Sequence, residues 1–387
     1  MPKLSPTARV RSGDWVAPEV APQPAPALPQ QPIAFNGKFL AAEPSGIHRV
    51  AEELIRAVDL LLAEAEAPAP EILAPRDAAR HLGTVLIGQR LVGAMTWIPW
   101  EQIELPHHAR GRLLVNLCNL GPVATRNAVT LVHDAQVYLS PASYPPAFRL
   151  WYRALLPVLG SRHRRILTVS DFSRDQLVRF GVASRDRITV IPNGVDHILR
   201  PAADLAAVRR LDLPARRYAC ALATTQAHKN IGLLLRAFAD PALADLTLVL
   251  IGSAGPDDFR ALGHHIPPNV AFAGRIPDAE LRGLLERALC FLCPSTTEGF
   301  GLPPLESMAL GTPAIVAPEG ALPETCGVAA LQADARDPAA WTARLRQLAD
   351  QPALWQARSR LGRSHAAGYT WRRAGTALLA ALADLAP

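Results

Sequence analysis

Short apolar segments rich in Val, Ile and Leu alternate with helical segments along most of this 387-residue chain. One series of such segments ends at the turn Pro192-Asn193-Gly194, and a second series begins at Tyr218. Continuous β-branched runs separated by helices are typical of parallel sheets that are covered on both faces. The two series therefore predict two doubly wound α/β domains, with ligands bound outside the carboxyl ends of the strands, in the cleft between the domains.

The pattern also predicts where the elements and domains lie. Expected strands are 84–87, 113–115, 129–132, 165–169 and 188–191 in the first series, and 218–222, 246–251, 270–272, 290–292 and 314–316 in the second. Expected helices are 50–65, 147–159, 173–180, 278–288, 304–310 and 371–385, with another starting near Ile231. The expected regions are a disordered leader at 1–32, which contains eight prolines, a first domain at 33–198, a second at 199–368, and a returning helix at 369–387.

Composition and charge exclude several classes of protein. Hydrophobic residues make up 49% of the chain, which excludes a wholly disordered protein, and the five cysteines argue against a secreted disulfide scaffold. No apolar run approaches the length of a membrane span, so we expect a soluble cytoplasmic protein. The segment 149–187 holds nine Arg against three Asp, which fits either an anionic partner or a solvated basic surface. We expect no nucleic-acid partner, because no nucleic-acid-binding motif accompanies the charge.

The strongest local signal runs from Pro294 to Glu306. A predicted buried strand leads into a glycine-bracketed turn, and Pro304 stands where a helix begins. Such a turn aims free backbone N–H groups and the helix dipole at an anion, most simply a phosphate. Glu298 and Glu306 are suited to accept hydrogen bonds from sugar or ribose hydroxyls. The alternative is an ordinary helix start with incidental acidic residues.

This stretch resembles the E-x7-E motif of retaining family-4 glycosyltransferases of the GT-B fold, in their mannosyltransferase-like group. Further segments resemble motifs of that family in the same order along the chain. They are Thr130-Leu131-Val132-His133-Asp134, 167–174, Ile191-Pro192-Asn193-Gly194-Val195-Asp196, Ala227-His228-Lys229-Asn230, Leu322-Pro323-Glu324 and Tyr369-Thr370-Trp371. Several ordered motifs are far more specific than one.

The resemblance implies transfer of a hexose from a nucleotide sugar, with retention of configuration and without a metal or other cofactor. It points to mannose from GDP-mannose as the donor group. The expected acceptor is a saccharide, or a saccharide linked to polyprenyl diphosphate, in bacterial polysaccharide biosynthesis. The basic segment 149–187 would then face the anionic inner surface of the membrane, to which the protein would bind peripherally.

The resemblance also implies roles for individual residues. The expected catalytic residues are His133, Lys229 and Glu298, with Lys229 stabilising the departing diphosphate. The expected donor-binding residues are Gly46, Lys229, Glu298, Gly299, Phe300, Gly301, Leu302, Glu306, Arg275 and Ile276. Within this set, Glu306 would bind the ribose, Gly46 would lie by the phosphates, and Arg275 and Ile276 would lie by the base. We expect His133 to position the substrates and not to act as a base, although a His at a strand end can also be a satisfied core residue.

One departure from the family pattern concerns positive charge. Many members carry an Arg five positions before the donor-domain Lys or adjacent to it, where this chain has Thr224 and His228. The candidates for a second cation are His228, Arg49 and Arg174. The departure keeps open a non-catalytic relative that binds nucleotide sugar or a partner transferase. A phosphorylase or an epimerase on the same fold is a further alternative.

Two weaker features receive structural interpretations. Cys290 and Cys293 have metal-ligand spacing, but they lack a second pair and lie in a predicted buried strand, so we interpret them as core residues. The pairs His107-His108 and His264-His265 have no carboxylate or Cys partner at ligand spacing. We therefore expect no metal site.

Overall fold

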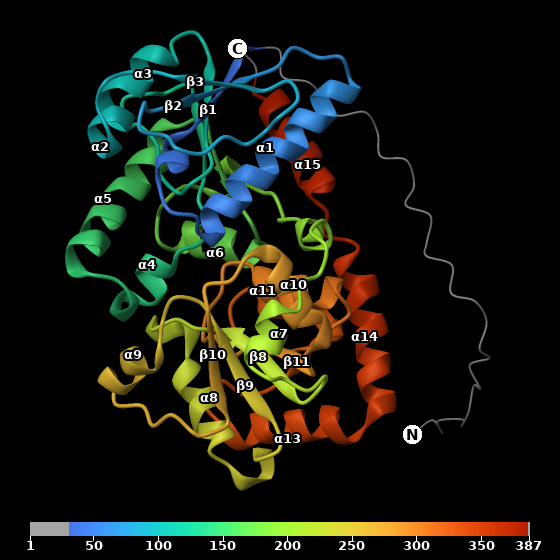
Figure 1. Ribbon diagram of the computed structural model, residues 1–387. Helices are drawn as coiled ribbons and strands as arrows, with labels where there is room; N and C mark the ends of the chain where they lie inside the picture. The colour runs from blue at the N-terminus through green and yellow to red at the C-terminus, as the bar shows by residue number, and fades with distance from the viewer. Residues whose placement is uncertain (1–30, 386–387) are drawn as a thin grey trace, which may run out of the picture.

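Two parallel β-sheets, one in each half of the chain, organise the computed structural model, which describes residues 31–385 (Figure 1). The first sheet has seven strands in the order β3-β2-β1-β4-β5-β6-β7, and the second has six in the order β10-β9-β8-β11-β12-β13. Helices cover both faces of each sheet, which confirms the predicted pair of doubly wound domains. Most of the predicted leader, 1–32, lies outside the described residues.

The strands of the first sheet are β1 (Ile33–Asn36), β2 (Glu71–Ala74), β3 (Gly88–Leu91), β4 (Leu113–Asn116), β5 (Ala128–Leu131), β6 (Arg165–Thr168) and β7 (Ile188–Val190). Those of the second are β8 (Tyr218–Leu222), β9 (Thr247–Ile251), β10 (Val270–Gly274), β11 (Cys290–Cys293), β12 (Ala314–Val316) and β13 (Leu331–Gln332). Every residue of β1, β4, β5 and β11 is buried, because these strands lie inside the sheets with helices on both sides.

The helices of the first half are α1 (Gly46–Glu64), α2 (Trp97–Pro99), α3 (Leu105–His108), α4 (Gln136–Leu139), α5 (Pro146–Arg162) and α6 (Asp171–Arg179). Those of the second half are α7 (Ala206–Arg210), α8 (Ile231–Phe238), α9 (Pro256–Ala261), α10 (Asp278–Arg287), α11 (Leu302–Ala309), α12 (Leu322–Thr325), α13 (Pro338–Asp350), α14 (Pro352–Ala366) and α15 (Trp371–Ala383). Two single-turn 3₁₀ segments matter below, η5 (Asp196–Leu199) and η6 (Ala227–Lys229).

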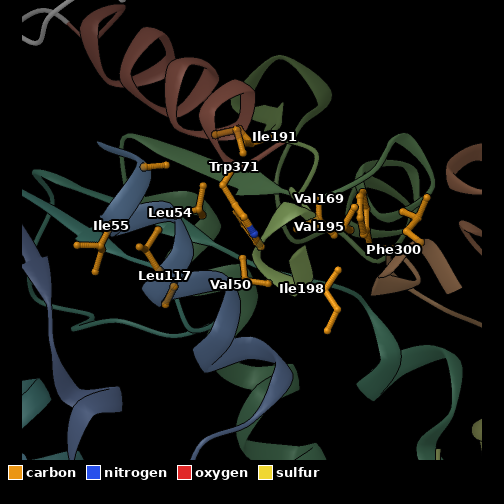
Figure 2. Packing of buried hydrophobic residues seen from close by; sticks show 14 of the residues in the cluster. Val50, Leu54, Ile55, Leu117, Val169, Ile191, Val195, Ile198, Phe300 and Trp371 are labelled. Atoms are coloured by element: carbon orange, nitrogen blue, oxygen red, sulfur yellow. The ribbon is translucent and has the colours of Figure 1, made fainter. Parts of the chain in front are cut away.

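Helix α15 leaves the second domain and packs along α1 of the first domain, so that the last and first helices lie side by side (Figure 1). A Cβ on Gly375 would lie 2.9 Å from the Cβ of Ala57, which shows how closely the two backbones approach. Trp371, the first residue of α15, belongs to the same buried cluster as Val50 and Leu54 of α1 and Val195 of the linker, the segment that leads from β7 into the second domain (Figure 2). This junction belongs to a hydrophobic core that is continuous between the two domains.

The chain crosses between the domains twice, and the two crossings lie against each other. The N–H of Val195 donates to the carbonyl of Tyr369 at 3.0 Å, and the N–H of Trp371 donates to Oδ1 of Asp196 at 2.8 Å. A Cβ on Gly194 would collide with the backbone of Trp371, which explains why the predicted turn carries glycine there.

The predicted strand at 84–87 is wrong, because this segment is a loop and the edge strand β3 follows it at Gly88. The N–H groups of Val85, Leu86 and Ile87 all donate to the buried carboxylate of Asp59, over 2.6–2.8 Å, instead of to a neighbouring strand. The prediction also missed the strands β1, β2 and β13 and the longer helices α13 and α14, besides several short helices.

The core interpretation of the cysteines is confirmed, since Cys290 and Cys293 are buried in β11 and all five cysteines are unpaired. Among residues 31–385, no helix is both long enough and apolar enough to cross a bilayer.

Candidate functional site

The candidate site lies where loops at the carboxyl ends of the two sheets meet. The loop after β11 places Gly299 directly against the segment after β5, and a Cβ on Gly299 would lie 2.7 Å from the Cβ of Asp134. The carbonyl of Gly299 accepts hydrogen bonds from Ser170 Oγ at 2.6 Å and Ser173 Oγ at 3.0 Å. Only glycine permits this approach of the two domains, so the turn lies directly against the first domain.

Lys229 and Glu298 form an ion pair at the base of this turn. Lys229 Nζ lies 2.7 Å from Oε1 and 2.9 Å from Oε2 of Glu298, and Ser295 Oγ donates to Oε1 at 2.6 Å. Burial alone would lower the pKa of Lys229, but the attraction of the Glu298 carboxylate outweighs it and raises that pKa. Burial conversely opposes ionisation of Glu298, yet Lys229 holds the pKa of Glu298 below its usual value. Both groups are therefore charged at neutral pH.

The backbone around Lys229 is fixed by the next residue. Asn230 ends η6 in the left-handed conformation, with φ of 56°, and its Nδ2 donates to the carbonyls of Pro294 at 3.1 Å and Ala335 at 2.8 Å. These bonds hold the Lys229 segment against the strand that carries Glu298. The two charged side chains, 69 residues apart in the chain, are thus positioned by the backbone and not only by their mutual attraction.

Helix α11 points its N-terminus at the same place. Gly301 precedes the helix in the left-handed conformation, with φ of 92°, and a Cβ there would lie 2.6 Å from a methyl group of Leu322. Pro303 and Pro304 follow within the first turn and carry no N–H groups, so the free donors of this helix end are those of the turn itself. Free N–H groups together with the helix dipole favour an anion at a helix end of this kind.

Glu306, on the second turn of α11, has a partner that the sequence did not reveal. Its Oε1 lies 3.0 Å from Nε2 of His197, a residue of η5 in the linker between the domains. Nδ1 of His197 accepts in turn from the indole Nε1–H of Trp371 at 3.0 Å. Trp371 belongs to a recognisable motif, but nothing in the local sequence around His197 signals a contact 109 residues away.

His133 lies at the end of β5, beneath the Gly299 turn, and is 6% exposed. Its Nε2 lies 2.9 Å from the carbonyl oxygen of Leu117, which can only accept, so Nε2 carries the proton. Burial lowers the pKa of His133 to about 4, against a smaller opposing effect of that hydrogen bond. The ring is therefore neutral at physiological pH.

The structure distinguishes the three candidates for a second cation. Burial, aided by the charge of Lys229, lowers the pKa of His228 to about 4, and its Nδ1 pairs with Ser143 Oγ at 2.8 Å. His228 is therefore neutral near pH 7, and this state disfavours it as the cation. Arg174 pairs with Asp171 of its own helix at 2.7 Å. Arg49 pairs across the cleft with Asp278 at 2.6 Å and lies within electrostatic range of Glu306.

The remaining predicted binding residues lie at ends of elements or in the turn itself. Gly46 is the first residue of α1, and a Cβ there would meet nothing within 4 Å, so the helix end borders open space. Arg275 and Ile276 follow β10 at the carboxyl edge of the second sheet, and Arg275 is exposed. Phe300 is buried, and its carbonyl accepts from Thr325 Oγ1 at 2.6 Å.

A second interdomain contact was also missed from the sequence. The carboxylate of Glu324 accepts from the backbone N–H groups of Asp171 at 2.8 Å and Phe172 at 3.0 Å, at the N-terminus of α6 in the other domain. A carboxylate at a helix N-terminus is stabilised by the free N–H groups and by the helix dipole. Within the described residues, no group of three or more His, Cys, Asp or Glu side chains is placed to hold a metal ion.

Sequence comparisons identify the class of protein. The family described as "Glycosyltransferase Family 4" matches residues 45–198, and the one described as "Glycosyl transferases group 1" matches residues 216–351. The "O-antigen chain mannosyltransferase B" of Escherichia coli is 32% identical over 268 residues, which cover 66% of this chain and 70% of that protein. The "D-inositol 3-phosphate glycosyltransferase" of Corynebacterium kroppenstedtii is 27% identical over 280 residues, 67% of this chain and 61% of that protein.

Among solved structures, Anabaena Alr3699/HepE in complex with UDP and glucose superimposes with a TM-score of 0.68, at 16% identity, over 92% of this chain and all of that chain. At this identity the likeness concerns the fold alone.

Proposed function

Since this chain belongs to the family-4 glycosyltransferases and has their GT-B fold, we propose that it is a retaining, metal-independent transferase of mannose from GDP-mannose. One observation carries the proposal. The charged pair Lys229–Glu298 and the N-terminus of α11 converge on the same turn, and that turn lies against His133 of the other domain. A nucleotide diphosphate and a sugar need this combination of positive potential and carboxylate acceptors.

The leaving diphosphate is stabilised by groups already in position. As the bond between the sugar C1 and the phosphate oxygen breaks, negative charge grows on the phosphate, and preorganised donors stabilise it most effectively. Lys229 supplies a full charge, and the N–H groups around Gly301 and Leu302 supply the helix-terminal donors. Arg49 contributes positive potential from the facing domain.

Retention follows from a front-face route. The acceptor hydroxyl oxygen bonds to C1 on the face from which the phosphate departs, and the hydroxyl proton passes to the departing phosphate oxygen. No protein base is needed for this proton transfer. The pKa of His133, at about 4, suits a neutral hydrogen-bonding residue that positions the sugar. Glu298, held ionised by Lys229, accepts from the sugar hydroxyls.

The proposed donor and acceptor rest on different observations. Mannose is suggested by the 32% identical relative, which is named as an O-antigen chain mannosyltransferase. That relative also supports a saccharide acceptor in polysaccharide biosynthesis, and we propose one carried on polyprenyl diphosphate. UDP, the nucleotide in the Anabaena structure, and an inositol phosphate acceptor, from the second relative's name, are the competing possibilities that a test must include.

We also propose peripheral binding to an anionic membrane, through α5 within the basic segment 149–187. Leu150 and Trp151 on this helix are exposed, and Arg149 and Arg153 flank them. Apolar side chains can enter the interface while each basic residue adds about 1 kcal/mol near an anionic surface. Sedimentation with phosphatidylglycerol vesicles tests this, and equal sedimentation of the Leu150→Glu/Trp151→Glu variant would contradict it.

The first experiment is a melting-temperature series with GDP-mannose, UDP-glucose and ADP-glucose, in the presence of EDTA, followed by transfer assays with the stabilising donor. Saturation at 100 times the dissociation constant adds about 2.7 kcal/mol of stability, which a melting shift detects. We expect GDP-mannose to stabilise the protein and to be consumed only when acceptor is added. Turnover without acceptor would indicate an epimerase, a need for inorganic phosphate would indicate a phosphorylase, and binding without turnover a non-catalytic relative.

A further inference from the structure

We propose that His197 is a positioning residue that orients Glu306 toward the ribose of the bound nucleotide and links that carboxylate to helix α15. The inference rests on the proposed function, in which Glu306 accepts from ribose hydroxyls. His197 is a linker residue that lies outside every motif quoted above for donor binding. The inference adds it to the residues that determine the affinity for the donor.

The geometry defines the direction of each hydrogen bond. The indole Nε1 of Trp371 can only donate, so Nδ1 of His197, 3.0 Å away, accepts. The neutral imidazole then carries its proton on Nε2, which donates to Oε1 of Glu306 at 3.0 Å. One carboxylate oxygen is thereby held by the protein, and the other, Oε2, is left to accept from a ligand hydroxyl.

Two of the three side chains, those of His197 and Trp371, are held in a low-dielectric setting. His197 is 5% exposed and Trp371 is 4% exposed, so their hydrogen bonds are shielded from competition with water. Trp371 lies in the core that joins α1 to the linker (Figure 2). Its backbone N–H also donates to Asp196, the neighbour of His197. The ring of His197 thus has one orientation, and that orientation fixes Glu306.

The hydrogen-bonded series Trp371–His197–Glu306 also has a consequence for the arrangement of the two domains. His197 lies on the segment that runs from the first domain into the second, and Trp371 lies where the chain returns to the first domain. Glu306 lies on α11 of the second domain. A change in the angle between the domains therefore alters the orientation of the carboxylate that receives the ribose. Donor binding and domain arrangement are coupled through His197.

The test uses ribose discrimination, which a purely structural role would not change. Calorimetry on the full chain measures dissociation constants for GDP and 2′-deoxy-GDP, and for UDP and 2′-deoxy-UDP. We expect the wild type to prefer the ribonucleotide about tenfold, as expected for one charge-assisted hydrogen bond. His197→Phe should reduce that preference to within about twofold by weakening ribonucleotide binding. His197→Gln keeps an N–H donor and should therefore retain most of the ribose preference of the wild type.

A matched control is His163→Phe, which removes another buried histidine with two hydrogen bonds, in the first domain. It should leave the ribose preference unchanged. If His197→Phe does not fold, Trp371→Phe keeps an aromatic ring and removes only the donor to Nδ1. That variant should lower the ribose preference about threefold, because the imidazole of His197 is then held less firmly in one orientation.

The outcomes separate this inference from the proposed function. If the wild type binds nucleotides with a ribose preference that His197→Phe and Trp371→Phe leave intact, the role of His197 is refuted while the function stands. A wild type that binds nucleotides without any ribose preference refutes the role as well. If the wild type binds none of the four nucleotides, the proposed function fails, and the role of His197 fails with it.

Discussion

Gly299→Ala tests whether the observed contact between the domains is the reactive arrangement. The new Cβ would lie 2.7 Å from the Cβ of Asp134 and 2.8 Å from the carbonyl oxygen of His133. Ordinary contacts begin near 3.4 Å, so the turn must withdraw by about 0.7 Å. Gly299 does not have a positive φ, so alanine brings no backbone strain and the effect is confined to the contact.

The withdrawal has a calculable cost. The hydrogen bonds from Ser170 and Ser173 to the Gly299 carbonyl would lengthen and weaken, and each is worth about 1 kcal/mol. Their loss lowers the equilibrium constant between the closed and open arrangements roughly 30-fold. Displacement of the turn relative to His133 adds to this, since misplacement by about 1 Å can cost 100-fold in rate. We therefore expect kcat to fall about 30-fold or more, with cooperative unfolding retained.

The assay is steady-state transfer from the nucleotide sugar, together with small-angle scattering to detect opening of the cleft. Gly88→Ala is the matched control, because a Cβ on Gly88 meets nothing within 4 Å and the residue lies on the edge strand β3. If Gly299→Ala kept kcat within about threefold of the control, this contact would not be part of the reactive state.

Three further predictions concern charge, pH and a loop. Lys229→Ala should lower kcat at least 100-fold in the transfer assay, because the leaving phosphate loses its nearest full charge, and near-normal turnover would refute that role. His133, His163 and His228 have pKa values of about 4 in the folded state, below the unfolded value of 6.5, so the unfolded state binds more protons as pH falls from 6.5 to 4. The free energy of unfolding from urea titrations should therefore drop between pH 7 and 5, by about 2 kcal/mol per histidine, and an unchanged free energy would contradict the burial argument. Asp59→Ala should cost about 2–4 kcal/mol in thermal unfolding and expose the 84–87 loop to proteases, because three N–H groups lose their acceptor, whereas Asp59→Asn should retain part of that stability.

Features with a local signal in the sequence were predicted well. Alternating strands and helices and the turn before α11 rest on periodicity or on motifs, whereas the ion pair between Lys229 and Glu298 was not expected from the sequence. The strand expected at 84–87 failed because its apolar residues suggested a sheet, whereas the deciding interaction is with Asp59, 26 residues away. Strand β2 was missed because it is only four residues long and comes directly after Pro68 and Pro70, which are typical of a loop.

The contacts between the domains could not be predicted in this way. His197 meets Glu306, and Glu324 caps α6, over separations of more than 100 residues. No periodicity or spacing encodes such pairs, since they depend on how two separately folded sheets are oriented. The neutral state of His228 has the same origin, because its burial is completed by Ser143 of the other domain.

The position of α15 has a consequence for the order in which the chain folds during synthesis. The apolar stripe of α1, with Val58 and Leu61, is covered by α15, which is about 300 residues later in the chain. As the polypeptide leaves the ribosome, the first domain cannot complete its core until the second domain has been translated. At about 5–20 residues per second, α1 waits for its partner for tens of seconds. Premature termination anywhere before residue 371 would therefore leave both domains incomplete, and not merely the second.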